Sequence, residues 1–124
     1  MEKTSLKKEV AGNHYQQFEM QPIELIADMD WDFFQGNIAK YALRAKFKNG
    51  QQDIDKAIHY CELAIELTEP DDGCEDWFGG IKKFVETNKL NVFWKTFLGE
   101  INHKNYELLK EMLTDTQCVK NYFL

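Results

Sequence analysis

Residues 36–50 read Gly36-Asn37-Ile38-Ala39-Lys40-Tyr41-Ala42-Leu43-Arg44-Ala45-Lys46-Phe47-Lys48-Asn49-Gly50, and this stretch decides the fold. It predicts a helix that stops at Asn49-Gly50, because glycine readily takes the positive φ angle found after a helix C-terminus. The next ten residues, Gln51-Gln52-Asp53-Ile54-Asp55-Lys56-Ala57-Ile58-His59-Tyr60, predict a second helix that runs back along the first. Together they predict a helical hairpin.

Polar and cationic side chains recur on one face of each predicted helix. The first helix carries Asn37, Lys40, Tyr41 and Arg44 at i, i+3, i+4 and i+7. The return helix carries Asp53, Lys56 and Tyr60 at i, i+3 and i+7. Residues at these spacings share a helical face. Lysine and arginine gathered on one face of a hairpin indicate a site for an anion, most plausibly a phosphate.

The antiparallel hairpin brings these two faces together near its turn. Arg44 should approach Asp53 or Lys56, so that Asp53 can orient Arg44 while the three cationic side chains meet phosphate oxygens. Asn37 can hydrogen-bond a base or sugar edge, and Tyr41 or Tyr60 can stack on a base. The competing interpretation is an ordinary solvated face, which is the usual environment of lysine and arginine on a helix.

A longer pattern surrounds the hairpin. His14-Tyr15, Pro22-Ile23-Glu24, Gly36-Asn37-x-x-Lys40-Tyr41-x-x-Arg44, Lys48-x-Gly50, Asp53, Lys56-Ala57 and Tyr60 follow in this order. Over about residues 14–67 this resembles a small family of tailed-bacteriophage proteins of unknown function, called SaV-like, which includes a nucleotide kinase without a P-loop. The resemblance implies a nucleotide ligand, a nucleoside triphosphate as phosphoryl donor and the host cytoplasm, and it adds His14 and Tyr15 to the ligand-facing residues.

The composition favours one compact all-α domain with a possible appendage. Of 124 residues, 44% are hydrophobic and 29% are charged, which supports a core and argues against wholesale disorder. Good helix formers dominate the periodic segments. We expect a flexible arm at residues 1–13, a helical-hairpin domain at residues 14–69 and additional C-terminal helices at residues 74–124 packed on it. The break between them is Pro70-Asp71-Asp72-Gly73.

Charge and cysteine usage narrow the possible partners and compartment. The net charge is −6, which disfavours duplex nucleic acid because duplex binders need a dominant positive field. Residues 36–60 nevertheless carry five basic and two acidic side chains, which suits a small anion held locally. Three cysteines without a pairing motif fit a reducing cytoplasm, with Cys61 in the core. Neither a signal peptide nor an apolar run long enough to cross a bilayer is visible.

The periodicity predicts the remaining elements. A short helix begins at Pro22 and ends near Met29, and Asp30 is the expected N-cap of a helix from Trp31 to about Lys48. The return helix should run from about Gln52 to Leu67. Its expected buried stripe is Ile54, Ala57, Ile58, Cys61, Ala64, Ile65 and Leu67.

The C-terminal half is less regular. Residues 74–88 predict a helix that Gly79-Gly80 weakens, and residues 89–99 can form either a helix or a short strand. Residues 105–114 predict a further helix. The apolar end Tyr122-Phe123-Leu124 should dock on the core or on a neighbouring subunit.

The sequence contains no P-loop and no zinc-ligand spacing. A kinase of this kind would hold phosphates with side chains and helix N-termini alone. An alternative is a magnesium site built from Glu24, Asp28, Glu62 and Glu66, as in all-α nucleotide pyrophosphatases. Those enzymes use denser acidic pairs than this sequence contains, and a solvated face is by far the commoner explanation of such acids.

These observations lead to a nucleotide-binding protein, with phosphoryl transfer to a deoxynucleoside monophosphate as the activity that the resemblance implies. Whether the chain is an enzyme stays open at this point. The alternative is a non-enzymatic phage effector that binds a host protein, favoured by the acidic run from Glu62 to Asp76 and by the aromatic C-terminal half. The many aromatic residues and the apolar terminus also predict a homo-oligomer, most simply a two-fold dimer.

Overall fold

The computed structural model describes residues 17–69 and 78–124, and these residues confirm the all-α fold. They contain helices and no strand. The α-helices are α1 (Pro22–Met29), α2 (Phe33–Arg44), α3 (Gln51–Leu67), α4 (Gly79–Thr87), α5 (Val92–Asn102), α6 (Tyr106–Thr114) and α7 (Thr116–Val119). Two 3-10 segments, η3 (Ala45–Phe47) and η4 (Lys120–Phe123), complete the described part.

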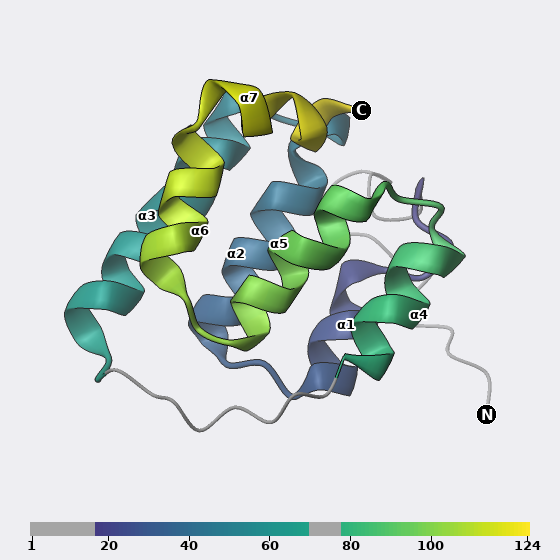
Figure 1. Ribbon diagram of the computed structural model, residues 1–124, viewed down its shortest axis with the longest axis horizontal. Helices are drawn as coiled ribbons and strands as arrows, with labels where there is room; N and C mark the ends of the chain where they lie inside the picture. Colours follow the sequence, from purple (N-terminus) through teal and green to yellow (C-terminus); the bar gives the residue numbers. More distant parts are fainter. Residues whose placement is uncertain (1–16, 70–77) are drawn as a thin grey trace.

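The six longer helices form two layers of three. Helices α1, α2 and α3 make the first layer, and α4, α5 and α6 make the second (Figure 1). The helices of the two layers pair in chain order, so that α4 packs on α1, α5 on α2 and α6 on α3. The chain therefore completes one layer before it builds the next, and the predicted hairpin is the α2–α3 pair of the first layer.

Three pairs of residues tie the layers together with hydrogen bonds. Met20 and Asn88 exchange two bonds, at 3.0 and 2.8 Å between the main chain of Met20 and the Asn88 amide. The Trp31 indole Nε1 donates to Asn102 Oδ1 at 3.1 Å. Gln35 Nε2 donates to the carbonyl oxygen of Ile101 at 3.0 Å. The last two bonds are buried and fix the start of α2 against the end of α5.

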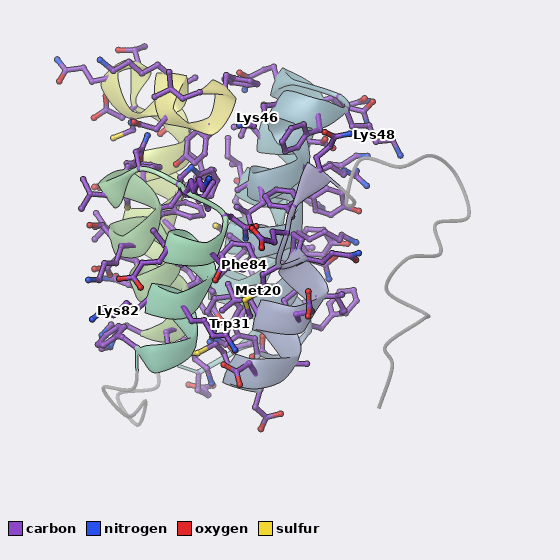
Figure 2. The ribbon with its side chains drawn as sticks, turned by 90° about the vertical axis from the view of Figure 1, so that its right-hand side faces the viewer. Met20, Trp31, Lys46, Lys48, Lys82 and Phe84 are labelled. Carbon is purple, nitrogen blue, oxygen red and sulfur yellow. The ribbon has the colours of Figure 1, made fainter. Side chains whose placement is uncertain are left out.

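The hydrophobic core fills the space between the layers. In Figure 2 the labelled side chains of Met20, Trp31 and Phe84 lie between the two groups of helices, whereas Lys48 and Lys82 lie at the periphery on opposite sides. The fully buried side chains come from both layers: Leu25, Ile38, Ile54, Ile81, Phe84, Phe97, Leu98, Ile101, Leu109 and Leu113. The C-terminal half is thus half of one core.

The start of α2 differs from the sequence prediction. Asp30 is not its N-cap, because Asp30 takes a left-handed conformation (φ 54°) and closes α1 instead. Asp32 is the cap: its carboxylate accepts from Gln35 N at 2.9 Å, and Gln35 Oε1 accepts from Asp32 N at 3.0 Å. This reciprocal pair is a capping box, which satisfies two backbone donors at once. The burial of Trp31 ahead of the cap explains why the helix begins two residues later than expected.

The hairpin turn is tighter than a straight helix to Lys48 would be. Helix α2 ends at Arg44 and continues as η3 to Phe47. Gly50 then takes φ 57°, as predicted, and its N–H donates to the Ala45 carbonyl at 2.9 Å. A side chain at this φ would be strained, so the glycine is what permits α3 to start at the next residue.

The buried stripe of α3 is correct except at its end. Ile54, Ala57, Cys61 and Ala64 are fully buried, which confirms Cys61 as a core residue. Burial raises the pKa of the Cys61 thiol to about 12. Ile65 and Leu67 are exposed, because the last turn of α3 extends past the beginning of α6 (Figure 1). The periodicity predicted the face of the helix but not where its partner stops.

The second layer shows which conformation the less regular C-terminal half of the sequence adopts. Gly79 and Gly80 begin α4 rather than weaken it, and Gly80 lies so close to α1 that a Cβ there would overlap Oδ2 of Asp28. Residues 92–102 form the helix α5, not a strand. Asn91 caps that helix by accepting from Phe93 N at 3.0 Å.

The chain end docks as expected through one residue. Tyr122 is buried, its ring lies against those of Trp94 and Phe97, and its hydroxyl donates to the Met112 carbonyl at 2.9 Å. Phe123 and Leu124 remain exposed. The docking is therefore on the chain's own core.

Several predictions fall on other residues. The arm at residues 1–13, the site residues His14 and Tyr15 and the break at residues 70–73 lie outside the described residues. Within residues 17–69 and 78–124, no helix combines the length and apolar character that crossing a membrane requires.

Candidate functional site

Three cationic side chains surround the ring of Tyr41 on the α2–α3 hairpin. Lys40 Nζ lies 4.5 Å from the ring centroid, the guanidinium carbon of Arg44 lies 4.6 Å from it, and Lys56 Nζ lies 5.2 Å from it. At these distances a cation is attracted by the negative face of an aromatic ring. We call Tyr41 with Lys40, Arg44 and Lys56 the Tyr41 cluster.

An aromatic row extends from this cluster along the hairpin. Tyr41 and Tyr60 are stacked, with centroids 5.8 Å apart and an interplanar angle of 11°. Tyr60 then meets the edge or face of Phe33 at 5.7 Å and 71°. Because α2 and α3 are antiparallel, the row leads from the cluster toward the start of α2. The two predicted stacking residues therefore contact each other.

Arg44 is held by Asp53 in a buried bidentate pair. Arg44 Nη2 donates to Oδ1 of Asp53 at 2.9 Å and Nε donates to Oδ2 at 3.2 Å. Asn49 N–H also donates to Oδ2 at 3.2 Å. Asp53 is 0% exposed and Arg44 is 9% exposed. The prediction that Asp53 orients Arg44 at the hairpin turn is confirmed.

The carboxylate of Asp53 stays ionised in this setting. Burial alone would raise its pKa, but the hydrogen bonds from Arg44 and Asn49 and the charge of the guanidinium outweigh burial. The pKa of Asp53 consequently lies below its ordinary value of 3.8. The pair is thus charged at neutral pH, and it pins the turn that joins the two helices of the site.

Lys40 and Lys56 lack the kind of ion pair that anchors Arg44. Both are half-buried, and among the described residues neither ammonium group forms an ion pair or a hydrogen bond. Asp53 balances one positive charge of the cluster, and no carboxylate of residues 17–69 or 78–124 pairs with Lys40 or Lys56. A surface of this kind can hold an anion through charge-assisted hydrogen bonds.

Asn37 lies one turn from the cluster on the same helix face. Its Nδ2 donates to the carbonyl oxygen of Phe33 at 2.8 Å. An amide that donates to a carbonyl must point its own oxygen elsewhere, so the hydrogen bond fixes which way the side chain faces. Asn37 is half-buried, and its Oδ1 is an available acceptor among the described residues.

The structure brings together seven of the nine predicted site residues, namely Asn37, Lys40, Tyr41, Arg44, Asp53, Lys56 and Tyr60. Arg44 is anchored by Asp53, as expected. The structure also adds Phe33, which the sequence analysis missed. Phe33 precedes Asn37 by four residues and Tyr41 by eight, so continuing the same helical face backward would have found it.

The acids proposed for magnesium do not gather. Glu24 Oε2 accepts from the backbone N–H of Gln21 at 2.7 Å, and Glu62 pairs with Lys110 at 3.4 Å. Within the part of the chain that the structure describes, no group of three or more metal-ligating side chains is found. These acids cap a helix and form a surface ion pair.

The fold and the Tyr41 cluster describe a two-layer all-α protein with a cationic, tyrosine-lined patch on its first layer. Residues 9–62 match the model of a protein family of unknown function, DUF3310. This domain contains every predicted site residue and ends within α3. No curated protein and no solved structure matches the chain.

Proposed function

We propose that the α2–α3 face binds a nucleotide through its phosphates. The observation that carries the proposal is the Tyr41 cluster, where Lys40 and Lys56 converge on one ring without a carboxylate partner among the described residues. The SaV-like resemblance supports the same ligand class. The acidic net charge of −6 favours a small ligand held locally over a polymer.

The resemblance extends the proposal to phosphoryl transfer in the cytoplasm of a phage-infected host. A nucleoside triphosphate would donate its γ-phosphoryl group to a phosphate oxygen of a deoxynucleoside monophosphate. The bond to the bridging oxygen breaks as the new P–O bond forms, which yields two diphosphates. Lys40 and Lys56 would neutralise charge on the transferring group, and Arg44, held by Asp53, would position the hairpin.

A ligand screen tests both parts. Thermal unfolding is measured with ATP, with each deoxynucleoside monophosphate and with inorganic tripolyphosphate. A ligand at 100 times its Kd should add about 2.7 kcal/mol of stability. Chromatography of ATP incubated with each monophosphate then reports diphosphate formation. Binding without turnover would leave a nucleotide-binding protein and remove the kinase, whereas no shift with any nucleotide would overturn the proposal.

Lys40→Gln and Lys56→Gln should each weaken nucleotide binding by about 10-fold or more, since a hydrogen bond to a charged group contributes about 1.5–3 kcal/mol. Isothermal titration measures the affinity. Lys82→Gln is the matched control, because it removes the same charge from an exposed lysine of the other layer (Figure 2). Equal affinities in all three variants would exclude the cluster as the phosphate site.

Arg44→Ala is a poorer probe of binding than the two lysine variants. Removing Arg44 leaves the buried Asp53 carboxylate without its bidentate partner, so the variant would lose stability together with affinity. The lysine side chains lie nearer the surface and can be changed without breaking a buried pair. The phosphate-binding role of Arg44 is therefore best judged from affinity per folded molecule.

The host-protein alternative is weaker than the sequence suggested. Phe84, Trp94 and Phe97 are buried and belong to the core, so they offer no surface to a partner. Glu62, at the start of the acidic run, pairs with Lys110. Nucleotide binding is consequently the function we put forward.

We also propose a homo-oligomer. Leu67, Val92 and Leu124 are each more than 60% exposed, and exposed apolar side chains of this size are candidates for an interface between copies of the chain. Static light scattering at micromolar concentration should give a mass of twice 14.6 kDa for the two-fold dimer. A mass of 14.6 kDa would contradict the prediction.

A further inference from the structure

Phe33 is the most exposed aromatic side chain of the described residues. It is 67% exposed, although it stands at the first position of α2 beside a well-packed core. Its ring contacts Tyr60 at 5.7 Å and Phe34 at 6.1 Å, both in edge-to-face arrangements. Despite these two contacts, most of the Phe33 side chain is open to solvent.

Phe33 belongs to the same surface as the Tyr41 cluster. The stacked pair of Tyr41 and Tyr60 connects them through two successive ring contacts, at 5.8 and 5.7 Å. Phe33 and Lys40 are seven residues apart on α2, which is a rise of about 10 Å along the helix. An exposed ring at one end and two lysine ammonium groups at the other match a ligand with an aromatic head and an anionic tail.

Asn37 lies between the two ends. Because its Nδ2 donates to the Phe33 carbonyl, its Oδ1 is left as an acceptor, one helical turn after Phe33 on the same face of α2. An acceptor one turn from an exposed aromatic ring suits a planar partner that carries N–H groups on its edge. Nucleobases have both properties, and every base has a face that can stack.

We infer that Phe33 stacks on the nucleobase of the bound nucleotide, with Asn37 Oδ1 accepting a hydrogen bond from a base N–H. The inference rests on the proposed function, since the lysines must hold the phosphates for the base to reach Phe33. It assigns the two ends of the ligand to two ends of α2. Phe33 is then a positioning residue for the base and makes no contribution to phosphate binding.

The test distinguishes the contribution of the base to the affinity from that of the phosphates. Isothermal titration measures the affinities of ATP and of inorganic tripolyphosphate for the wild type, Phe33→Ala, Phe33→Trp and Asn37→Ala. Val92→Ala is the matched control, because Val92 is a similarly exposed apolar residue, on α5. Phe33 is exposed, so its removal should leave the fold intact, and circular dichroism verifies this.

Phe33→Ala should weaken ATP binding by about 10-fold or more and leave tripolyphosphate affinity unchanged, as expected when base stacking is lost. Phe33→Trp should retain ATP affinity. Because the base stacks on the new tryptophan, ATP should quench the fluorescence of this variant more than it quenches that of the wild type. Asn37→Ala should weaken ATP selectively and to a smaller extent. Val92→Ala should change neither affinity.

Other outcomes overturn the inference in distinguishable ways. If Phe33→Ala binds ATP normally while Lys40→Gln does not, the phosphate site stands and the base lies elsewhere. If Phe33→Ala loses ATP and tripolyphosphate equally, Phe33 does not read the base. If it changes only the mass found by light scattering, the ring belongs to an interface between copies of the chain. If the wild type binds neither ligand, the proposed function fails and the inference fails with it.

Discussion

Asp53→Asn should lower the free energy of unfolding by about 3–5 kcal/mol, the range for removing one partner of a buried ion pair. The change leaves the guanidinium of Arg44, only 9% exposed, facing a neutral amide. It also weakens the acceptor for Asn49 N–H at the hairpin turn. Urea denaturation followed by circular dichroism measures the effect.

Asp55→Asn is the matched control for this variant. It removes the same charge two residues along α3, from an exposed side chain that is hydrogen-bonded to Gln51 at 3.0 Å. Surface changes of this kind usually alter stability by less than about 0.5 kcal/mol. Similar losses in the two variants would mean that the buried pair contributes nothing special to the fold.

The same pair sets a pH dependence whose direction follows from the lowered pKa of Asp53. A carboxyl group with a lower pKa in the folded state stabilises the fold above its unfolded pKa, near 3.8, and loses that effect as pH falls through the folded value. The wild type should therefore lose stability below about pH 3.8 more steeply than Asp53→Asn. The stability gap between the two proteins should be constant near neutrality and narrow in acid.

Trp94→Ala should cost about 3–5 kcal/mol of stability, the usual range for truncating a large buried aromatic side chain. Trp94 is 5% exposed and meets the rings of Phe97 and Tyr122, both at 5.6 Å. Val92→Ala, on the same helix but exposed, should change stability little. Denaturant midpoints measure both effects, and equal losses would contradict the core assignment.

The Trp94→Ala variant also tests whether the ligand site depends on the first layer alone. Every residue of the Tyr41 cluster is in the first layer, and Trp94 is in the second. Trp94→Ala should therefore reduce stability while nucleotide affinity per folded molecule stays near that of the wild type. Lys40→Gln should do the reverse. If both variants remain folded and lose affinity equally, the ligand site depends on both layers.

The hairpin was predictable because its signals are local. The Asn49-Gly50 stop, the apolar period of α3 and the i, i+3, i+4, i+7 spacing of the cationic face all act within a few turns of helix. The pairing of Arg44 with Asp53 followed from antiparallel geometry alone. The burial of this pair could not be predicted in the same way. The spacing of residues shows which of them share a helix face, but it does not show what covers that face.

The features that the sequence did not predict depend on the other layer. Nothing in the sequence near Gly80 indicates that α1 lies against it, so the close packing at this glycine could not be predicted. Residues 89–99 gave no decision between helix and strand because a short apolar run fits both. Phe33 was not predicted as a site residue, because its place in the helical pattern does not show whether its ring is buried or exposed.

The pairing of each first-layer helix with the corresponding second-layer helix has a consequence for how the chain folds. The three hydrogen-bonded links described above join residues separated by 68, 71 and 66 positions, so each of these contacts between the layers is long-range in the sequence. Each of these links closes a long loop, and loop-closure entropy rises only slowly with length. The α2–α3 hairpin, whose contacts are more local, can form before those long loops close.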